Sequence, residues 1–209
     1  MPSSARTQAI ELALLLLLIQ FLDIATAWQI HSGTVFSEPT ASVILWFDLV
    51  STVLFIGLAI ALVVALFVGH EHLIDRIAIV YLSLGIVQVA LNVLMLVGSA
   101  HVRNDSVLWG LWDLGAGYFE IVAVFTGWYF FMDRVIPGGA FDFPERERRA
   151  DFEPKILDYA FIAFNTNATF GPTAETILSR WVKGLMMLQT LLSLALLLVF
   201  VARIVSLFN

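Results

Sequence analysis

Residues 155–176 read KILDYAFIAFNTNATFGPTAET, and this segment decides the fold. Its first half is apolar and aromatic, and its second half is rich in turn-forming and small polar residues. About 12 helical residues rise about 18 Å, which is too short for a hydrocarbon core about 30 Å thick. The segment can therefore enter a membrane, but the chain has to return to the surface from which it came.

Five longer apolar stretches accompany this segment, at residues 10–28, 42–69, 77–100, 107–136 and 181–208. Each is long enough to cross the hydrocarbon core as a helix. The composition agrees, because 60% of the residues are apolar, 13% are charged and the mean hydropathy is +0.90. The sequence therefore predicts an all-α membrane protein with about five transmembrane helices, a re-entrant pore helix and a filter-like loop.

These elements divide the chain into two parts. Residues 1–106 carry three peripheral transmembrane helices, and residues 107–209 form a pore module. The module has an outer helix at 107–136, a charged loop at 137–154, a pore helix at 155–167, a filter-like loop at 168–176 and an inner helix at 179–208. We expect the charged loop to be a solvated surface segment. The C-terminal end of the pore helix is electronegative and points inward, where it favours a cation.

Several classes of function are excluded by composition. The chain has no cysteine, which removes disulfides, thiolate nucleophiles and iron–sulfur clusters. A net charge of −6 argues against nucleic-acid binding. We find no convincing nucleophile, base or metal-ligand set, so we expect neither enzyme activity nor a cofactor or bound metal.

The order of an outer span, a short aromatic helix, a Thr-x-Gly strand and a closing span is similar to the pore module of tetrameric potassium channels. It also resembles a group of bacterial membrane proteins often described as ion-channel-like, in which an aromatic Asp-Tyr pore helix precedes a Pro-Thr turn. The residues that carry the resemblance are 157–161 (LDYAF) and 165–173 (NTNATFGPT). The resemblance implies a homotetramer in the lipids of a bacterial plasma membrane, with the C-terminus in the cytoplasm.

The potassium filter Thr-Val-Gly-Tyr-Gly corresponds in this chain to Thr169, Phe170, Gly171, Pro172 and Thr173. Proline lacks an N–H and threonine resists positive φ, so the outer half of a potassium-type filter is not expected here. We therefore expect a shorter or wider constriction that passes potassium or sodium with weak selectivity. The resemblance also implies that five residues support the pore helix: Asp158, Tyr159, Asn165, Thr166 and Asn167.

Polar side chains interrupt two of the predicted spans. Gln189, Thr190 and Ser193 lie in a leucine-rich helix, where they either line a water-filled cavity or make helix-to-helix hydrogen bonds. Asp113 and Glu120 share a face of the fourth span, and ionisable groups inside a membrane are costly enough to be functional candidates.

Three functions follow from these observations. The main prediction is an oligomeric cation channel built around the filter-like loop. A proton-coupled transporter that uses Asp113 and Glu120 is the first alternative, and a non-conducting, pore-like scaffold is the second. Asp23 lies near the end of the first span, and we expect it at a membrane interface, outside any of these sites.

Overall fold

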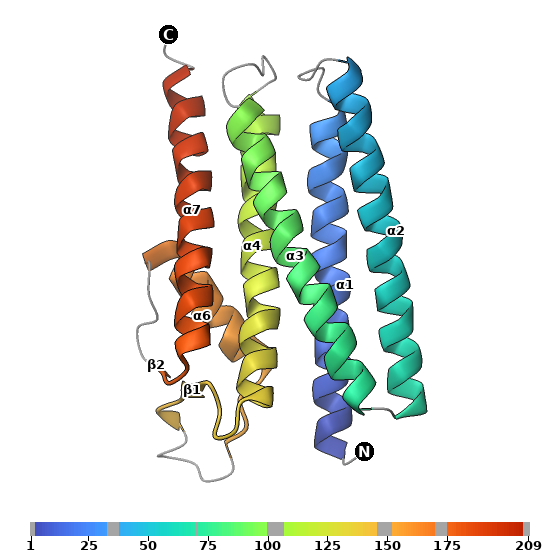
Figure 1. Cartoon of the computed structure of the whole chain (residues 1–209). Coiled ribbons are helices and arrows are strands. Elements are labelled where there is room, and N and C mark those ends of the chain that lie inside the picture. Colours follow the sequence, from blue (N-terminus) through green and yellow to red (C-terminus); the bar gives the residue numbers. More distant parts are fainter. Residues whose placement is uncertain are drawn as a thin grey trace.

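A computed structural model describes residues 3–32, 38–69, 71–99, 107–145, 152–169 and 175–206. These residues form six helices and two short strands (Figure 1). The helices are α1 (Ser3–Ser32), α2 (Glu38–Val68), α3 (Glu71–Ser99), α4 (Val107–Val135), α6 (Ile156–Thr169) and α7 (Arg180–Ser206). The strands are β1 (Phe141–Asp142) and β2 (Thr176–Ile177).

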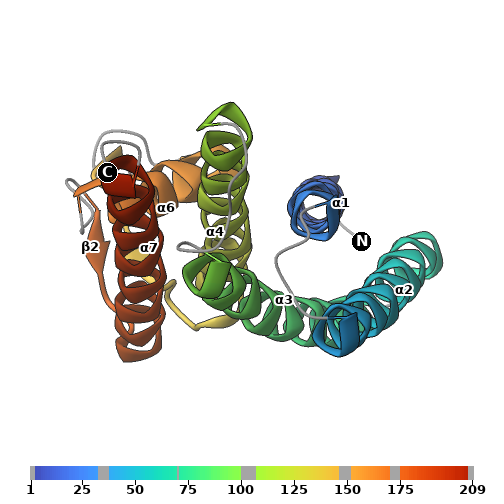
Figure 2. The same ribbon diagram turned by 90° about the horizontal axis from the view of Figure 1, so that it is seen from above.

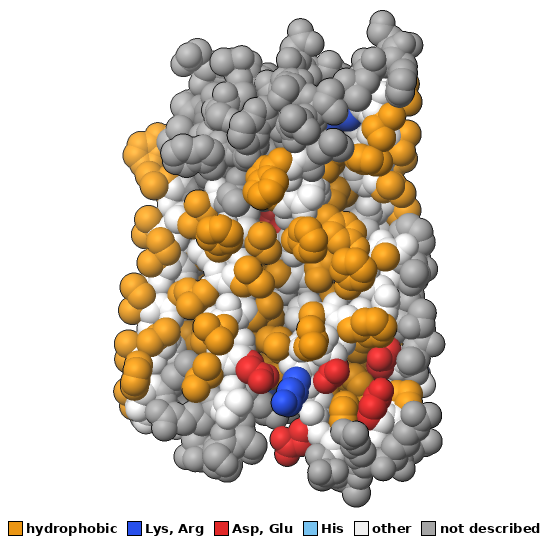
Figure 3. Space-filling model, turned by 180° about the vertical axis from the view of Figure 1, so that it is seen from behind, with side chains coloured by type: hydrophobic (Ala, Val, Ile, Leu, Met, Phe, Trp, Pro, Cys, Tyr) orange, Lys and Arg blue, Asp and Glu red, His pale blue; other side chains and the backbone are white. Residues whose placement is uncertain are grey.

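The five long helices run up and down in one bundle, and the short helix α6 crosses the lower half of the bundle beside α4 and α7 (Figure 1). Within the described residues, three helical segments are long and apolar enough to cross a membrane: His72–Gly98, Leu114–Val135 and Arg180–Val205. The prediction of a helical membrane protein is confirmed to this extent. Seen from behind, hydrophobic side chains cover most of the described surface, and most of the charged side chains gather at the lower end (Figure 3). A bilayer that surrounds the apolar part would leave these charges near water.

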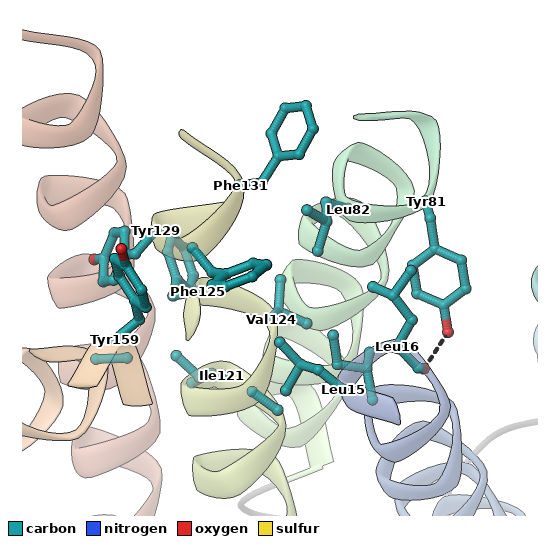
Figure 4. Close-up of a cluster of buried hydrophobic side chains, with 14 of the residues drawn as sticks. Leu15, Leu16, Tyr81, Leu82, Ile121, Val124, Phe125, Tyr129, Phe131 and Tyr159 are labelled. Atoms are coloured by element: carbon teal, nitrogen blue, oxygen red, sulfur yellow. Dashed lines mark hydrogen bonds between the residues drawn. The ribbon is translucent and has the colours of Figure 1, made fainter. Parts of the chain in front are cut away.

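Helix α4 is the centre of the bundle, because it packs against α1, α3, α6 and α7. In the view from above, it lies between the group α1–α3 and the pair α6 and α7 (Figure 2). Its buried face carries Ile121, Val124 and Phe125, which belong to the same buried cluster as Leu15 and Leu16 of α1 (Figure 4). The predicted outer helix at 107–136 is thus the element that joins the two predicted parts of the chain.

Helix α3 connects to α4 and to α1 by close packing and hydrogen bonds. Gly127 of α4 faces Leu82 of α3 so closely that a Cβ atom there would lie 2.7 Å from the Leu82 side chain. The indole nitrogen of Trp128 donates to the Leu82 carbonyl oxygen at 3.0 Å. The Tyr81 hydroxyl of α3 donates to the Leu16 carbonyl oxygen of α1 at 2.6 Å (Figure 4). Small residues allow such close approach of membrane helices.

The chain leaves α4 through Gly138 and Gly139, which have φ angles of 83° and 84°. Residues that carry a Cβ rarely adopt this conformation, so the two glycines permit the turn. The following strand β1 pairs antiparallel with β2, with Phe141 opposite Ile177. Because β1 precedes α6 and β2 follows it, the excursion through α6 starts and ends at the same end of the bundle.

Three apolar residues of the predicted charged loop are buried, although the other described residues of the loop lie at the surface. Ala140, Phe141 and Phe143 are 0%, 0% and 1% exposed and belong to the core. The other described residues of the loop's first half are exposed or partly exposed, as expected: Pro137, Gly138, Gly139, Asp142, Pro144 and Glu145. The rings of Phe141 and Phe143 lie 6.0 Å and 5.6 Å from the ring of Tyr159 in α6. These aromatic contacts bury the strand under α6, and residues 146–151 lie outside the described part of the chain.

Candidate functional site

Helix α6 begins with a local cap. The Asp158 carboxylate accepts a hydrogen bond from the Lys155 backbone N–H at 2.7 Å, and the Asp158 N–H donates to the Lys155 carbonyl at 2.9 Å. This reciprocal pair satisfies polar groups that a helix start leaves without partners. The negative charge of Asp158 in the first turn also stabilises the helix, because it lies near the positive, N-terminal end of the helix dipole. Asp158, one of the predicted supporting residues, therefore sets where α6 starts.

The first turns of α6 are tied to α4 through Asp133, a residue that the sequence did not single out. The Tyr159 hydroxyl donates to Asp133 Oδ2 at 2.6 Å. Asp133 Oδ1 accepts the backbone N–H groups of Ala140 and Phe141, at 2.5 Å and 2.9 Å. One carboxylate thus holds the end of α4, the start of β1 and the start of α6. The sequence feature that could have pointed to Asp133 is its position shortly before the Pro137-Gly138-Gly139 turn, whose backbone N–H groups need acceptors.

The other end of α6 is tied to α7 through Asn167. Asn167 Oδ1 accepts hydrogen bonds from Gln189 Nε2 and Ser193 Oγ of α7, both at 2.6 Å. Gln189 Nε2 also donates to the Ala163 carbonyl at 2.8 Å, and its Oε1 accepts from the Tyr129 hydroxyl of α4. Figure 4 shows Tyr129 on the side of α4 that faces α7. The network joins α4, α6 and α7 through four side chains that are each nine-tenths or more buried.

The hydroxyl groups of three predicted site residues turn back onto their own helices. Thr166 donates to the Ile162 carbonyl at 2.8 Å, Thr190 to the Met186 carbonyl at 2.9 Å, and Ser193 also contacts the Gln189 carbonyl at 3.0 Å. A hydroxyl that donates to the carbonyl four residues earlier has a hydrogen-bond partner within its own helix and needs none from another element. In the described part of the chain, Gln189 and Ser193 make helix-to-helix hydrogen bonds, and Thr190 makes a local one.

The filter-like residues follow directly on this anchored end. Thr169 is the last residue of α6, but its side chain lies outside the described part of the chain, as do Phe170, Gly171, Pro172 and Thr173. Nearby, Asn165 is partly buried, and Asn167 is 6% exposed. Within the described residues, Asn167 Nδ2 has no hydrogen-bond partner. A buried donor therefore lies two residues before the start of the filter-like sequence.

A second polar cluster lies between α1, α3 and α4. Asn92 Nδ2 donates to Asp23 Oδ1 at 3.1 Å and to the two carboxylate oxygens of Glu120 at 3.1 Å and 3.2 Å. Asp23, Asn92 and Glu120 are only 2%, 2% and 1% exposed. We expected Asp23 at a membrane interface, but the structure buries it beside Glu120. The reason is that α1 turns this side chain toward Asn92 of α3. The side chain of Asp113 lies outside the described residues.

The chemistry of this second cluster differs from that of the α6 anchor. Two carboxyl groups share a neutral amide donor, and two like charges so close together in an apolar interior repel each other. Binding a proton relieves that repulsion. The second cluster thus places two acidic groups side by side in a buried site. At the end of α6, by contrast, the hydrogen bonds of Asn167 with Gln189 and Ser193 join neutral groups, and only the start of the helix is held by carboxylates, those of Asp133 and Asp158.

The described residues contain no group of three or more His, Asp or Glu side chains arranged to hold a metal ion. Comparison of the chain with protein-family models, with curated protein sequences and with solved structures found no match.

Proposed function

We propose that the chain is one subunit of an oligomeric channel that conducts monovalent cations, potassium or sodium, with weak selectivity. The observation that carries this proposal is a half-length helix, α6, whose two flanking strands pair at one end of the bundle. Its 14 residues rise about 21 Å, less than a hydrocarbon core of about 30 Å. In a bilayer α6 would be re-entrant, and the loop after it would lie at membrane depth.

The anchors at both ends of α6 support this proposal. Asp133 holds Tyr159 near the start of the helix, and Gln189 and Ser193 hold Asn167 near its end. A helix fixed at both ends aims its electronegative C-terminal end in one direction, and that end favours a cation. A conducting loop needs such rigid support, because carbonyl oxygens select ions only when they are held in place.

The proposed oligomer follows from geometry. One loop cannot encircle an ion, so several subunits have to surround a common axis, and we propose four. Helix α7 offers a surface for this assembly, because 33% of its most apolar segment is buried within the subunit, compared with 72% for α4. Its exposed side chains Met187, Leu191 and Leu198 would face neighbouring subunits, lipid or the axis.

The test is ion flux through liposomes that contain the purified protein. Potassium and sodium should both pass, and Gly171→Trp should abolish or alter the flux. Gly57→Trp is the matched control, because Gly57 lies on the exposed side of α2 with no atom within 4 Å of an added Cβ. Flux that is the same in Gly171→Trp and in the wild type contradicts the channel, and cross-linking that never reaches four subunits contradicts the tetramer.

The proposed location is a bacterial plasma membrane with the C-terminus in the cytoplasm. An epitope tag after Asn209 should then become accessible to antibody only when the cells are permeabilised. Labelling of intact cells would reverse the orientation and place the loop after α6 on the cytoplasmic side.

A second candidate function rests on the cluster of Asp23, Asn92 and Glu120. Two buried carboxyl groups on one amide can exchange a proton, so the same bundle could couple proton movement to transport. Flux would then depend on a pH gradient and be lost in Glu120→Gln, while Gly171→Trp would leave it intact. The two candidates thus predict opposite results for the same pair of variants.

A further inference from the structure

An apolar groove lies on the outer surface of the bundle, between α1, α4 and α6. Helices α1, α4 and α6 form its walls, and its volume is about 470 Å³. Leu22 lines it on α1, Ala123 on α4, and Leu157 and Ala160 on α6. The groove is therefore the place where the first helix of the chain and the proposed pore helix share a surface.

The walls offer almost nothing to water. Among the lining residues, the polar side chains are those of Thr126 and Glu11. The Thr126 hydroxyl donates to the Val122 carbonyl of its own helix at 2.7 Å, so it is already satisfied. Water occupies a cavity only where several polar groups hold it, and apolar cavities stay dry or take an apolar guest.

The length of the groove matches one leaflet of a bilayer. Between Glu11 and Leu22, helix α1 rises about 16 Å at 1.5 Å per residue. Half of a hydrocarbon core of about 30 Å is about 15 Å, the depth that one acyl chain spans. An extended acyl chain therefore fits along α1 from one end of the groove to the other.

The charged end of the groove indicates the headgroup. Glu11 lies in the N-terminal third of α1, toward the lower end of the bundle, where charged side chains gather in Figure 3. Glu11 is partly buried, and within the described residues no hydrogen bond or ion pair occupies its carboxylate. A primary ammonium can donate charge-assisted hydrogen bonds to a carboxylate, whereas choline has no N–H and glycerol has no positive charge.

We infer that the groove between α1, α4 and α6 binds one acyl chain of a phosphatidylethanolamine molecule, with the ethanolamine ammonium beside Glu11. The inference rests on the proposed insertion in a membrane and not on conduction. The bound chain packs against Leu157 and Ala160 of α6 on one side and against α1 on the other. The lipid thus completes the packing around the proposed pore helix and connects it to the peripheral helices.

Native mass spectrometry of the full chain in detergent tests this inference without any measurement of flux. The protein is mixed with equal amounts of palmitoyl-oleoyl phosphatidylethanolamine, phosphatidylcholine and phosphatidylglycerol, and the lipids retained per subunit are counted. We expect one retained lipid, predominantly phosphatidylethanolamine. Ala160→Trp fills the groove and should reduce lipid retention about tenfold, which corresponds to about 1.4 kcal/mol of binding free energy. Ala61→Trp, on the exposed side of α2, is the matched control and should retain the lipid.

Glu11→Gln keeps the shape of the side chain and removes its charge, so it tests the inference even if Ala160→Trp does not fold. This variant should retain one lipid but lose the preference for phosphatidylethanolamine. Equal retention by Ala160→Trp and Ala61→Trp would overturn the acyl-chain site, as would a wild-type protein that retains no lipid. An unchanged headgroup preference in Glu11→Gln would overturn the role of Glu11. A lipid-free dimer that is lost in Ala160→Trp would assign the groove to a second copy of the chain.

Discussion

The Tyr159 hydroxyl donates a hydrogen bond of 2.6 Å to the carboxylate of Asp133, a residue on another helix that also accepts the backbone N–H groups of Ala140 and Phe141. This contact connects the start of α6 to the end of α4 at the point where β1 begins. Since the same carboxylate serves three donors, its loss should affect all three elements together.

Asp133→Ala should therefore destabilise the protein more than Tyr159→Phe. The alanine variant leaves three donors without their acceptor, whereas the phenylalanine variant removes one hydrogen bond to a charged group, which contributes about 1.5–3 kcal/mol. Thermal unfolding in detergent, followed by circular dichroism, measures the difference. Asp142→Asn is the control, because this side chain is exposed on β1. If Asp133→Ala and Asp142→Asn lowered the melting temperature equally, the Asp133 carboxylate would not organise the turn.

Gln189→Leu should be among the most damaging changes in α7. It leaves Asn167 with one donor fewer, removes a partner from the Tyr129 hydroxyl and buries no new polar group. We therefore expect the free energy of unfolding to fall by about 1–3 kcal/mol. Thr190→Val on the same helix should have little effect, because its hydroxyl contacts only its own helix in the described structure. Unfolding of both variants in the same detergent provides the comparison. If Thr190→Val lowered the free energy of unfolding as much as Gln189→Leu, the hydrogen bonds of Gln189 would not stabilise the protein as proposed.

Gly127→Ala and Gly184→Ala should have opposite effects on stability. At Gly127 a Cβ atom would lie 2.7 Å from the buried Leu82 side chain, so overpacking should cost about 1–3 kcal/mol. At Gly184 no atom lies within 4 Å, and alanine should stabilise the helix by about 0.5–1 kcal/mol. Melting temperatures of the two variants test the close approach of α3 and α4. A Gly127→Ala protein that melts at or above the wild-type temperature argues against it.

Asn92→Leu should destabilise the bundle more than Glu120→Gln. Removing Asn92 takes the shared amide donor from two buried carboxyl groups, which should lower the free energy of unfolding by about 1–3 kcal/mol. Glutamine at position 120 keeps an acceptor for Asn92 and removes the repulsion between two carboxylates, so its cost should stay below about 1 kcal/mol. Chemical unfolding in detergent ranks the two variants, and the reverse order would mean that the carboxylate of Glu120 has another, stronger partner.

Much of the helical architecture could be predicted from hydrophobic pattern and length. The predicted helix at 107–136 is α4 (Val107–Val135), and the predicted short helix at 155–167 is α6 (Ile156–Thr169). Polar residues in apolar runs, such as Glu120 and Gln189, could also be singled out, because the cost of burying them is known without the fold. Their partners could not be predicted. Asp23, Asn92 and Glu120 lie on three helices, and no local pattern indicates which faces of these helices meet.

The sequence by itself determined that the chain is a bundle of long apolar helices with one helix too short to cross a membrane. That conclusion depends on local properties, namely the length and apolarity of each stretch compared with the thickness of a bilayer. Only the tertiary structure decided how the short helix is held, through Asp133 and Tyr159 at its start and through Asn167, Gln189 and Ser193 near its end. It also decided that β1 and β2 pair and that Asp23 joins Glu120. These contacts join residues far apart in the chain, and they exist only when the packing of α4 against its neighbours brings those residues together.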